Sequence, residues 1–450
     1  MRRKYHQTSS LRSQLVPVGL GICVGGALLG GATAPSTHAQ ATPSAGYEAA
    51  KMEKIERENQ ELRKRLEALE HLAQKEGIMA SGEAPKSMPV AALSSINISG
   101  FVQASYFYNT KEPRDGKSDA YLWNTTHNSF SINKVKLTLA SGTVDPDKWD
   151  AGFRASFIWG EDAQNLNTGS GSQTVTNASG FPVGVQKASS SGLETLREAY
   201  VELNAPLGTG LNLKAGQLIS LLNWESGDGG AANPNFSQGN QWWFTGNGPS
   251  AGVQAAYAFT PKVDLKLRVQ NGMFAGPIDG NDAKAYVGSL GLKPIDKLWA
   301  NIIGWYSKES DALTVSGGSA IGGYQVTKQL GTGFEFDYFH FDHAGAGNGD
   351  IWSVGGWMWY DFTPKAGVAF RADYIDSTDG VLGPAVRPGA GILTPDTDGT
   401  LSSLTFTFNW KPAPNIKVQP EVRWDHTSYK NGLDGVQDRI TVGAGVSYLF

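Results

Sequence analysis

The sequence contains almost no cysteine: its 450 residues include only Cys23, close to the N-terminus. Disulfide bonds therefore contribute nothing to the stability of the rest of the chain. Long apolar runs are missing too, since no stretch of about 18 apolar residues follows residue 39, which excludes a membrane-spanning helix there. A large excess of one charge is also missing, because the chain has 38 Lys and Arg and 42 Asp and Glu, which gives a formal net charge of −4. A strongly basic protein that binds nucleic acid is thereby excluded.

Glycine and aromatic residues are abundant instead. Glycine accounts for 56 of the 450 residues, about 12% against a usual share of ~7%. The chain also has 13 Trp, 15 Tyr and 19 Phe, whereas disordered chains are depleted in aromatic residues. This composition indicates a folded chain that relies on aromatic rings and small residues more than on a thick aliphatic core.

Residues 1–39 have the pattern of a secretory signal peptide. Basic residues from Arg2 to Arg12 precede an uncharged, Gly-rich apolar stretch over 15–32, and residues 37–39 form a small-x-small cleavage signal. We expect cleavage after Ala39. The alternative is a retained membrane anchor, which the glycines within the apolar stretch disfavour.

A separate helical unit is predicted over residues 40–81. Apolar residues recur there at heptad spacing, with one polar position in the seam. The seam consists of Met52, Ile55, Asn59, Leu62, Leu66 and Leu69. A single solvated helix is the alternative, but one apolar stripe makes such a helix marginal alone, so we expect a coiled-coil stalk. Residues 82–95 then form a linker rich in Pro and Gly.

From residue 96 the hydrophobic period changes to two. Val135, Leu137 and Leu139, for example, alternate with polar residues, as in two-faced β-strands. Sixteen such segments are predicted. They cover residues 96–109, 129–140, 149–160, 194–205, 210–221, 250–260, 263–272, 283–294, 297–308, 314–327, 329–342, 350–363, 366–377, 402–412, 415–428 and 439–450.

The connections between these segments alternate in length. Tight turns such as 260–262 and 363–365 stand at every second junction, and the other junctions are long and rich in Gly, Asn, Ser and Asp, as in 223–249. A soluble sandwich has no reason to sort its loops in this way, whereas outer-membrane barrels have short periplasmic turns and long external loops. The sequence therefore predicts an all-β, 16-stranded antiparallel transmembrane β-barrel over 96–450, preceded by the short α-helical coiled coil.

The last predicted strand ends on aromatic residues. Val442, Val446, Tyr448 and Phe450 share one face, and small polar residues occupy the other. Tyr448 and Phe450 resemble the C-terminal signal that barrel-assembly machinery recognises in bacterial outer-membrane proteins. We expect that machinery and the lipid bilayer to be partners of the chain.

Residues 96–450 resemble the OmpL-like family of β-barrel porins. The resemblance rests on four stretches, which are residues 128–137, 197–201, 213–217 and 235–237. It implies a sixteen-strand channel and does not cover the stalk. The stalk is similar, by position, to periplasmic coiled coils ahead of some trimeric sugar porins, so we expect a homotrimer, although Asn59 could equally favour a dimer.

Charged residues alternate with the apolar face and are expected to line a water-filled pore. Neither sign prevails among them, and the alternative for each is a wall residue that only pairs across strands. The selected pore-lining residues are Lys134, Lys136, Arg154, Glu198, Glu202, Lys214, Lys266, Arg268, Arg371, Asp373, Lys417, Glu421 and Arg423. Asp264, Glu335, Asp337 and Asp425 share this pattern.

The connection over 223–249 is the predicted constriction. It mixes polar and aromatic residues over a length at which loops are usually functional. The residues singled out are Trp224, Glu225, Asp228, Trp242 and Trp243. The alternative to inward folding is an external lid.

The predicted function is passive diffusion of ions and small hydrophilic solutes through an outer-membrane porin of a Gram-negative-type bacterium. No catalysis, cofactor or metal is expected; the G-x-S-x-G match at Ser250 enters a strand instead of opening a helix. The alternative function is a structural outer-membrane protein whose coiled coil contacts the cell wall and tethers the envelope.

Overall fold

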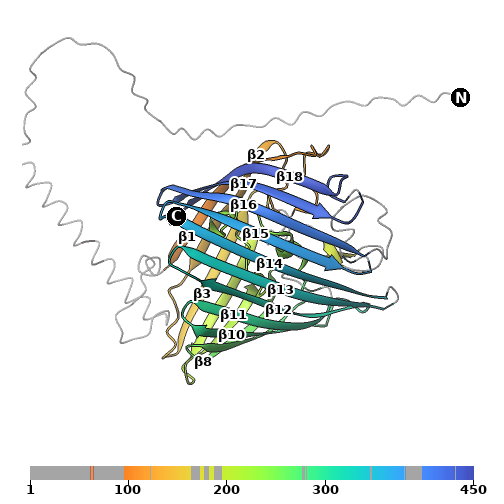
Figure 1. Cartoon of the computed structure of the whole chain (residues 1–450). Helices are drawn as coiled ribbons and strands as arrows, with labels where there is room; N and C mark the ends of the chain where they lie inside the picture. Colours follow the sequence, from red (N-terminus) through yellow and green to blue (C-terminus); the bar gives the residue numbers. More distant parts are fainter. Residues whose placement is uncertain are drawn as a thin grey trace, which may run out of the picture. The chain divides into compact units, whose positions relative to one another are not determined.

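Sixteen antiparallel strands close into one barrel in the computed structural model (Figure 1). The structure describes residues 61, 64, 96–121, 123–163, 173–176, 182–186, 195–275, 279, 281–344, 347–379, 381, 398–430 and 432–450. The predicted signal peptide and linker, and the seam residues of the predicted stalk, lie outside them. Within the predicted stalk, Glu61 and Lys64 are described, and both are helical.

Each barrel strand pairs with its neighbours in sequence order, except that β3 pairs with β6 and β1 closes the ring on β18. The barrel strands are β1 (Asn97–Asn109), β2 (Ser129–Ala140), β3 (Asp150–Trp159), β6 (Leu196–Ala205), β7 (Leu211–Leu218), β8 (Ser250–Thr260), β9 (Val263–Gln270), β10 (Ala285–Ile295), β11 (Leu298–Lys308), β12 (Leu313–Gln325), β13 (Leu330–His343), β14 (Gly347–Thr363), β15 (Ala366–Ser377), β16 (Gly399–Ala413), β17 (Ile416–Thr427) and β18 (Asp438–Leu449). All sixteen predicted strands are present, with ends that differ by up to three residues.

A further antiparallel pair lies outside the ring. β4 (Gln173–Thr176) and β5 (Pro182–Gln186) form a separate two-stranded sheet. Both lie within the long loop predicted between the strands at 149–160 and 194–205. Each is too short to give a clear period-two pattern.

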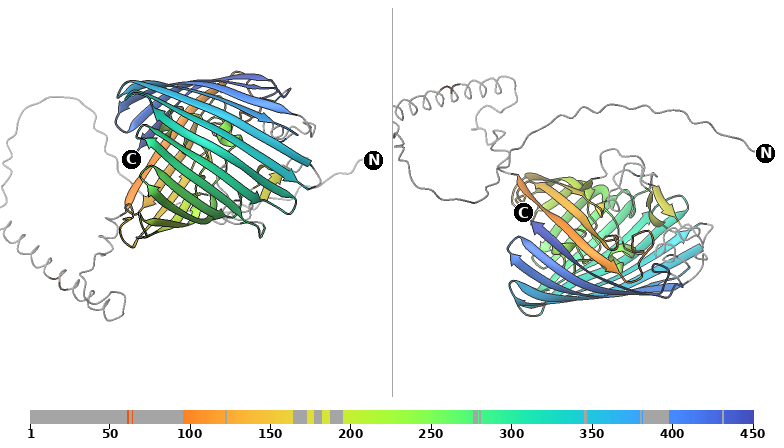
Figure 2. Two further views of the ribbon diagram at one scale, coloured as in Figure 1. Left: turned by 60° about the horizontal axis from the view of Figure 1, so that its bottom comes forward. Right: turned by 90° about the horizontal axis from the view of Figure 1, so that it is seen from above.

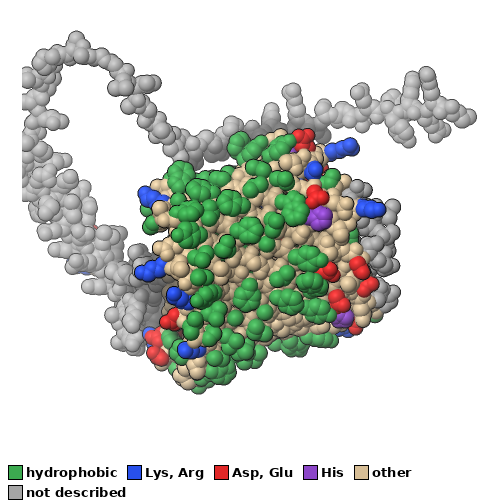
Figure 3. All heavy atoms as spheres, viewed as in Figure 1, with side chains coloured by type: hydrophobic (Ala, Val, Ile, Leu, Met, Phe, Trp, Pro, Cys, Tyr) green, Lys and Arg blue, Asp and Glu red, His purple; other side chains and the backbone are tan. Residues whose placement is uncertain are grey.

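The alternation of side chains follows the pleat of the sheet. On β16, Leu404, Phe406 and Phe408 are exposed on the outer face, and the polar residues between them are buried inside the ring. On the side of the barrel seen in Figure 3, apolar side chains are spread over the strands among small and polar residues. Such an apolar band around a closed sheet fits contact with hydrocarbon. Among the described residues, no helix is long and apolar enough to cross a membrane.

One part of the inner wall is apolar, contrary to the expectation of a polar lumen. Near the long-loop ends of β10–β16, inward residues such as Val287, Trp305, Phe339 and Phe341 are buried in one cluster with Met273 of the β9–β10 connection. Both faces of these strands carry apolar residues at this level. Here the interior is a packed core that fixes the loops.

The seam between β1 and β18 ends at the C-terminal residue. Phe450 exchanges two backbone hydrogen bonds with Gly100, of 2.9 and 3.0 Å. Its ring covers Gly100, where an added Cβ would lie 2.7 Å from the ring. Tyr448 and Phe450 are both half exposed on the outer face.

Candidate functional site

The connection between β7 and β8 folds into the barrel. It contains the short helices η1 (Gly230–Ala232) and α4 (Asn240–Phe244), and its hydrogen bonds reach inward side chains of β1, β2 and β13–β17. Its helix is seen within the ring of strands in Figure 2. We call residues 219–249 the inner loop.

Buried carboxylates hold the backbone of the inner loop. Glu335 of β13 accepts a 2.8 Å hydrogen bond from the N–H of Trp224. Glu421 of β17 accepts the N–H groups of Phe236 and Ser237, at 2.8 and 3.2 Å. Each of these wall acids therefore accepts hydrogen bonds from backbone donors of the loop.

Two buried arginines hold the loop from the same side. Arg371 of β15 donates to Glu225 at 2.8 Å, and both side chains are fully buried. Arg423 of β17 donates to the carbonyl of Gln238 and to the side chain of Asn240, each at 2.6 Å. Removing one member of a buried, hydrogen-bonded ion pair is costly, so these contacts fix the loop strongly.

Aromatic contacts complete the anchoring. The ring of Trp224 stacks on Trp357 at 4.6 Å and contacts Trp359 at 5.8 Å, both on β14. Phe236 stacks on Phe107 of β1 and fills the space above Gly445 of β18, where any side chain would collide with it. The inner loop is thus packed against the β13–β18 and β1–β2 side of the lumen.

The β1–β2 connection also enters the mouth of the barrel, although its sequence gave no sign of this. Tyr121 lies between the guanidinium groups of Arg423 and Arg439, each 4.4 Å from its ring. Burial raises the pKa of Tyr121 to about 12, so its hydroxyl stays protonated and donates to Asp425 at 2.7 Å. Trp123 contacts Trp242 of the inner loop at 5.4 Å.

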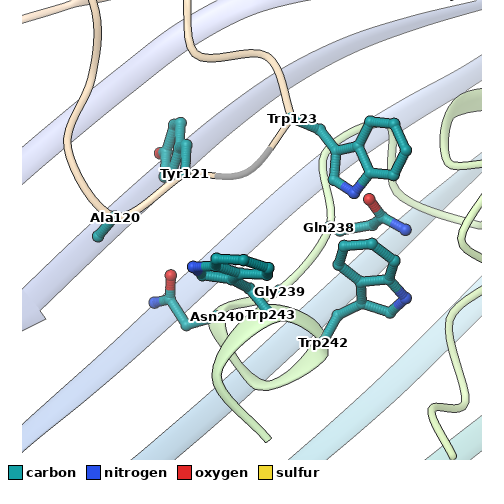
Figure 4. Close-up of a pocket in the computed structure, with 8 residues that line it drawn as sticks. All are labelled: Ala120, Tyr121, Trp123, Gln238, Gly239, Asn240, Trp242 and Trp243. Atoms are coloured by element: carbon teal, nitrogen blue, oxygen red, sulfur yellow. The ribbon is translucent and has the colours of Figure 1, made fainter. Parts of the chain in front are cut away.

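A small pocket separates these two connections. Figure 4 shows Gln238 between Trp123 and Trp242, with Trp243 and Tyr121 nearby. The pocket encloses about 10 Å³, room for about one water molecule. Trp242 and Trp243 therefore lie at the junction of two loops, where their rings pack against neighbouring side chains.

Most of the predicted pore-lining residues fall into two groups. On β15–β17, Arg371, Asp373, Glu421 and Arg423 are almost fully buried beneath the inner loop. On β3, β7 and β9, water reaches the side chains of Arg154, Lys214 and Lys266, whose exposed fractions are 37%, 25% and 34%. We call this second region, β3 and β6–β9, the open wall.

Most bases of the open wall have an acidic partner. The shortest N–O distances are 2.6 Å for Arg154–Glu198, 3.6 Å for Lys214–Glu202 and 3.6 Å for Lys266–Asp264. Arg268 differs, because its hydrogen bonds go to the neutral side chains of Gln254 and Gln270 and to the carbonyl of Ile219.

The remaining predicted residues, Lys417, Lys134 and Lys136, each have polar partners in loops inside the barrel. Lys417 of β17 donates to the carbonyl of Asn233 at 2.7 Å. On β2, Lys134 lies 3.1 Å from Asp162 and 3.6 Å from the centre of the Trp123 ring. Burial raises the pKa of Asp162, which follows the end of β3.

Lys136 reaches across to the inner loop. Its Nζ lies 2.7 and 2.8 Å from the two carboxylate oxygens of Asp228.

The neighbouring base Arg197 was not predicted from the sequence to line the pore. It stands next to Glu198, and adjacent strand residues normally face opposite sides. A register shift between β3 and β6 at Ser156 accompanies its burial.

Among the residues that the structure describes, no three His, Cys, Asp or Glu side chains form a group that could hold a metal ion. Ser250 is buried at the start of β8. It therefore lacks the strand-to-helix setting in which a nucleophilic serine is presented.

The family model described as "Putative beta-barrel porin-2, OmpL-like" matches residues 95–450. No curated protein sequence matches the chain significantly. Among solved structures, the chain is similar to OprB of Pseudomonas putida, with 14% identity, a TM-score of 0.52, and coverage of 80% of this chain and 96% of that one.

Two further solved structures are similar over 79% of this chain and 99% of theirs, each with a TM-score of 0.51. They are an anion-selective porin from Comamonas acidovorans, at 12% identity, and a loop-deletion mutant of OmpT, an outer membrane protein of Vibrio cholerae, at 10%. At these identities the likeness concerns the fold.

Proposed function

Because the chain belongs to the OmpL-like family of β-barrel porins, which are channels of the outer membrane, we propose that it lets ions and small hydrophilic solutes diffuse passively across that membrane. The observation that supports this most is the open wall, where charged side chains are exposed to water inside a closed sheet. A barrel of about sixteen strands is wide enough for an aqueous channel beside a folded-in loop. Diffusion down a gradient requires no catalytic group.

Purified protein added to planar lipid bilayers is expected to produce discrete, ohmic conductance steps. Their size should grow with the salt concentration, since hydrated ions carry the current. Empty detergent and heat-unfolded protein are the controls. Bilayers that stay silent at all protein concentrations would contradict the proposed channel function.

We further propose the arrangement of the rest of the chain. Residues 1–39 direct export, residues 40–81 form a periplasmic coiled-coil stalk joined by the linker 82–95, and three copies assemble into a trimer. The heptad pattern supports the stalk. One solved OmpT structure of Vibrio cholerae, 10% identical with a TM-score of 0.50, is described as a trimer form. Tyr448 and Phe450 are proposed to be read by the barrel-assembly machinery.

A tethering function through the stalk is the second candidate, favoured by the heptads alone. Deleting residues 40–81 is expected to leave the single-channel conductance unchanged, because every residue of the open wall lies after residue 95. The measurement pairs bilayer recordings with a test of envelope integrity, such as detergent sensitivity of cells. Normal conductance together with a fragile envelope would add the tethering role, and lost conductance would contradict our assignment of the channel to the barrel.

A further inference from the structure

A single carboxylate of the inner loop stands among basic side chains of the wall. Three consecutive loop residues, Gly227, Asp228 and Gly229, face β2 and β6. Lys136 binds both carboxylate oxygens of Asp228, at 2.7 and 2.8 Å. Basic groups thus approach the loop at the point where it carries its own negative charge.

The two glycines allow this close approach. A side chain at Gly227 would collide with the guanidinium group of Arg197, and a Cβ at Gly229 would lie 3.2 Å from Nζ of Lys134. Gly229 also has a φ of +63°, which favours glycine. The loop backbone is therefore shaped to lie against positively charged groups.

A fourth base completes the group. We call Lys134, Lys136, Arg154 and Arg197 the cation cluster. Arg154 is the most accessible member, at 37% exposed, and it forms a 2.6 Å ion pair with Glu198. The cluster's acidic neighbours among the described residues are Asp162, Glu198 and Asp228. The four bases thus outnumber the acids by one, and by two when Asp228 is removed.

A solute anion can displace the Asp228 carboxylate from Lys136 without releasing the loop from the wall. Its side chain is 25% exposed, so water reaches the carboxylate. The loop is held elsewhere, through Glu225 on Arg371 and through the backbone N–H groups on Glu335 and Glu421. An anion that enters from the water could therefore compete for Lys136 while the loop stays in place.

The part of the wall beneath the inner loop also affects the balance of charge that permeating ions meet. Glu335, Asp337 and Glu421 are at most 4% exposed beneath the inner loop. The loop shields these acids from permeating ions together with Arg371 and Arg423, whereas Arg268 of β9, which is 6% exposed, has no acidic partner among its hydrogen bonds. Fields from uncompensated arginines in a low-dielectric wall attract anions.

We propose that the cation cluster is an anion site inside the channel, that it takes the carboxylate or phosphate oxygens of small anionic solutes, and that Asp228 is its resident competitor. The channel consequently favours anions over cations. Arg and Lys donors suit this chemistry, because Arg matches oxyanions in a bidentate fork and Lys acts as a compact charge. This inference rests on the proposed channel function.

The test compares two isosteric substitutions that each remove one negative charge from the lumen. Asp228→Asn acts at the cluster, and Asp264→Asn acts on the open wall, beside Lys266 at 3.6 Å. Reversal potentials in a potassium chloride gradient give the permeability ratio of chloride to potassium. We expect a ratio above one for the wild type and a further rise of up to about tenfold in Asp228→Asn. One unit charge about 6 Å away in water changes the local concentration of a monovalent ion about threefold, in opposite directions for chloride and potassium.

Inorganic phosphate serves as the second probe. It should reduce the chloride current of Asp228→Asn at about a third of the concentration needed for the wild type, and Asp264→Asn should show a smaller change. Asp228→Glu should restore wild-type values. Lys136→Gln should lower the chloride preference, which tests the cluster independently if Asp228→Asn does not assemble.

The outcomes distinguish failure of the anion site from failure of the channel function. A conducting wild type without chloride preference, or equal shifts in Asp228→Asn and Asp264→Asn, would overturn the anion site and leave the channel function standing. A wild type that does not conduct would overturn the channel function itself. Heat-modifiable migration on gels confirms that each variant is a folded barrel.

Discussion

Excising residues 226–244 and joining the ends with a short Gly-Ser linker is expected to raise single-channel conductance by about two- to threefold. The excised segment contains both short helices and lies inside the barrel. A barrel of about sixteen strands leaves a water-filled lumen when no loop occupies it, and conductance grows with the open cross-section. Planar-bilayer recordings of the excised and full-length proteins measure the difference.

The same excision should strengthen the preference for anions. Asp228 is the one charged residue among the excised residues 226–244, so the lumen loses a negative charge that now lies against the cation cluster. The wall acids and the wall bases that the loop now covers are equal in number. The acids are Glu335, Asp337, Asp373, Glu421 and Asp425, and the bases are Lys136, Arg197, Arg371, Lys417 and Arg423. The reversal potential in a salt gradient is therefore expected to shift toward that of an anion-selective pore.

Gly445→Leu provides a matched control of full length. The new side chain must displace Phe236, whose ring fills the space over Gly445, and so disturbs the loop at one anchor only. Its conductance should lie between those of the wild type and the excised protein. If the excised barrel folds and conducts no more than the wild type, the inner loop does not restrict the pore.

The period-two pattern predicts the barrel well because it follows directly from the pleat. On β16, the sequence alternates Thr405, Phe406, Thr407 and Phe408, and the structure places the two types on opposite faces. A one-residue slip would expose every threonine to lipid, so the register is strongly specified. The same reasoning identified the charged residues that point inward.

The pattern fails where both faces carry similar residues. Phe336 and Tyr338 point outward on β13, yet Phe339 and Phe341 point inward and are buried. Alternation cannot separate a lipid-facing ring from one that packs under a loop. The apolar part of the inner wall was missed for this reason.

The period-two pattern of the strands also cannot predict which wall residues contact the inner loop. Glu335 binds the backbone of Trp224 across 111 positions of sequence, and Arg371 meets Glu225 across 146. The length and composition of the loop predicted a constriction. Which wall residues it would cover depends on the three-dimensional path of a loop whose own secondary structure is two short helices.

Deleting Phe450 is expected to lower the amount of folded barrel in the outer membrane by at least about tenfold. The deletion removes the two backbone hydrogen bonds with Gly100 at the seam between β18 and β1. Each such bond contributes about 1 kcal/mol, and their loss acts where the sheet must close. The deletion also takes away the terminal aromatic ring that we propose the assembly machinery reads.

Phe362→Ala is the matched control for this deletion. Phe362 is an aromatic residue at the short-turn end of β14, 56% exposed on the outer face against 51% for Phe450, and far from the closing seam. Heat-modifiable protein in outer-membrane fractions, measured on gels, should stay near the wild-type level in this control and return in Phe450→Tyr. Normal levels of folded barrel in the deletion variant would contradict a role of Phe450 in closure and assembly, because neither the lost hydrogen bonds nor the lost ring would then limit either step.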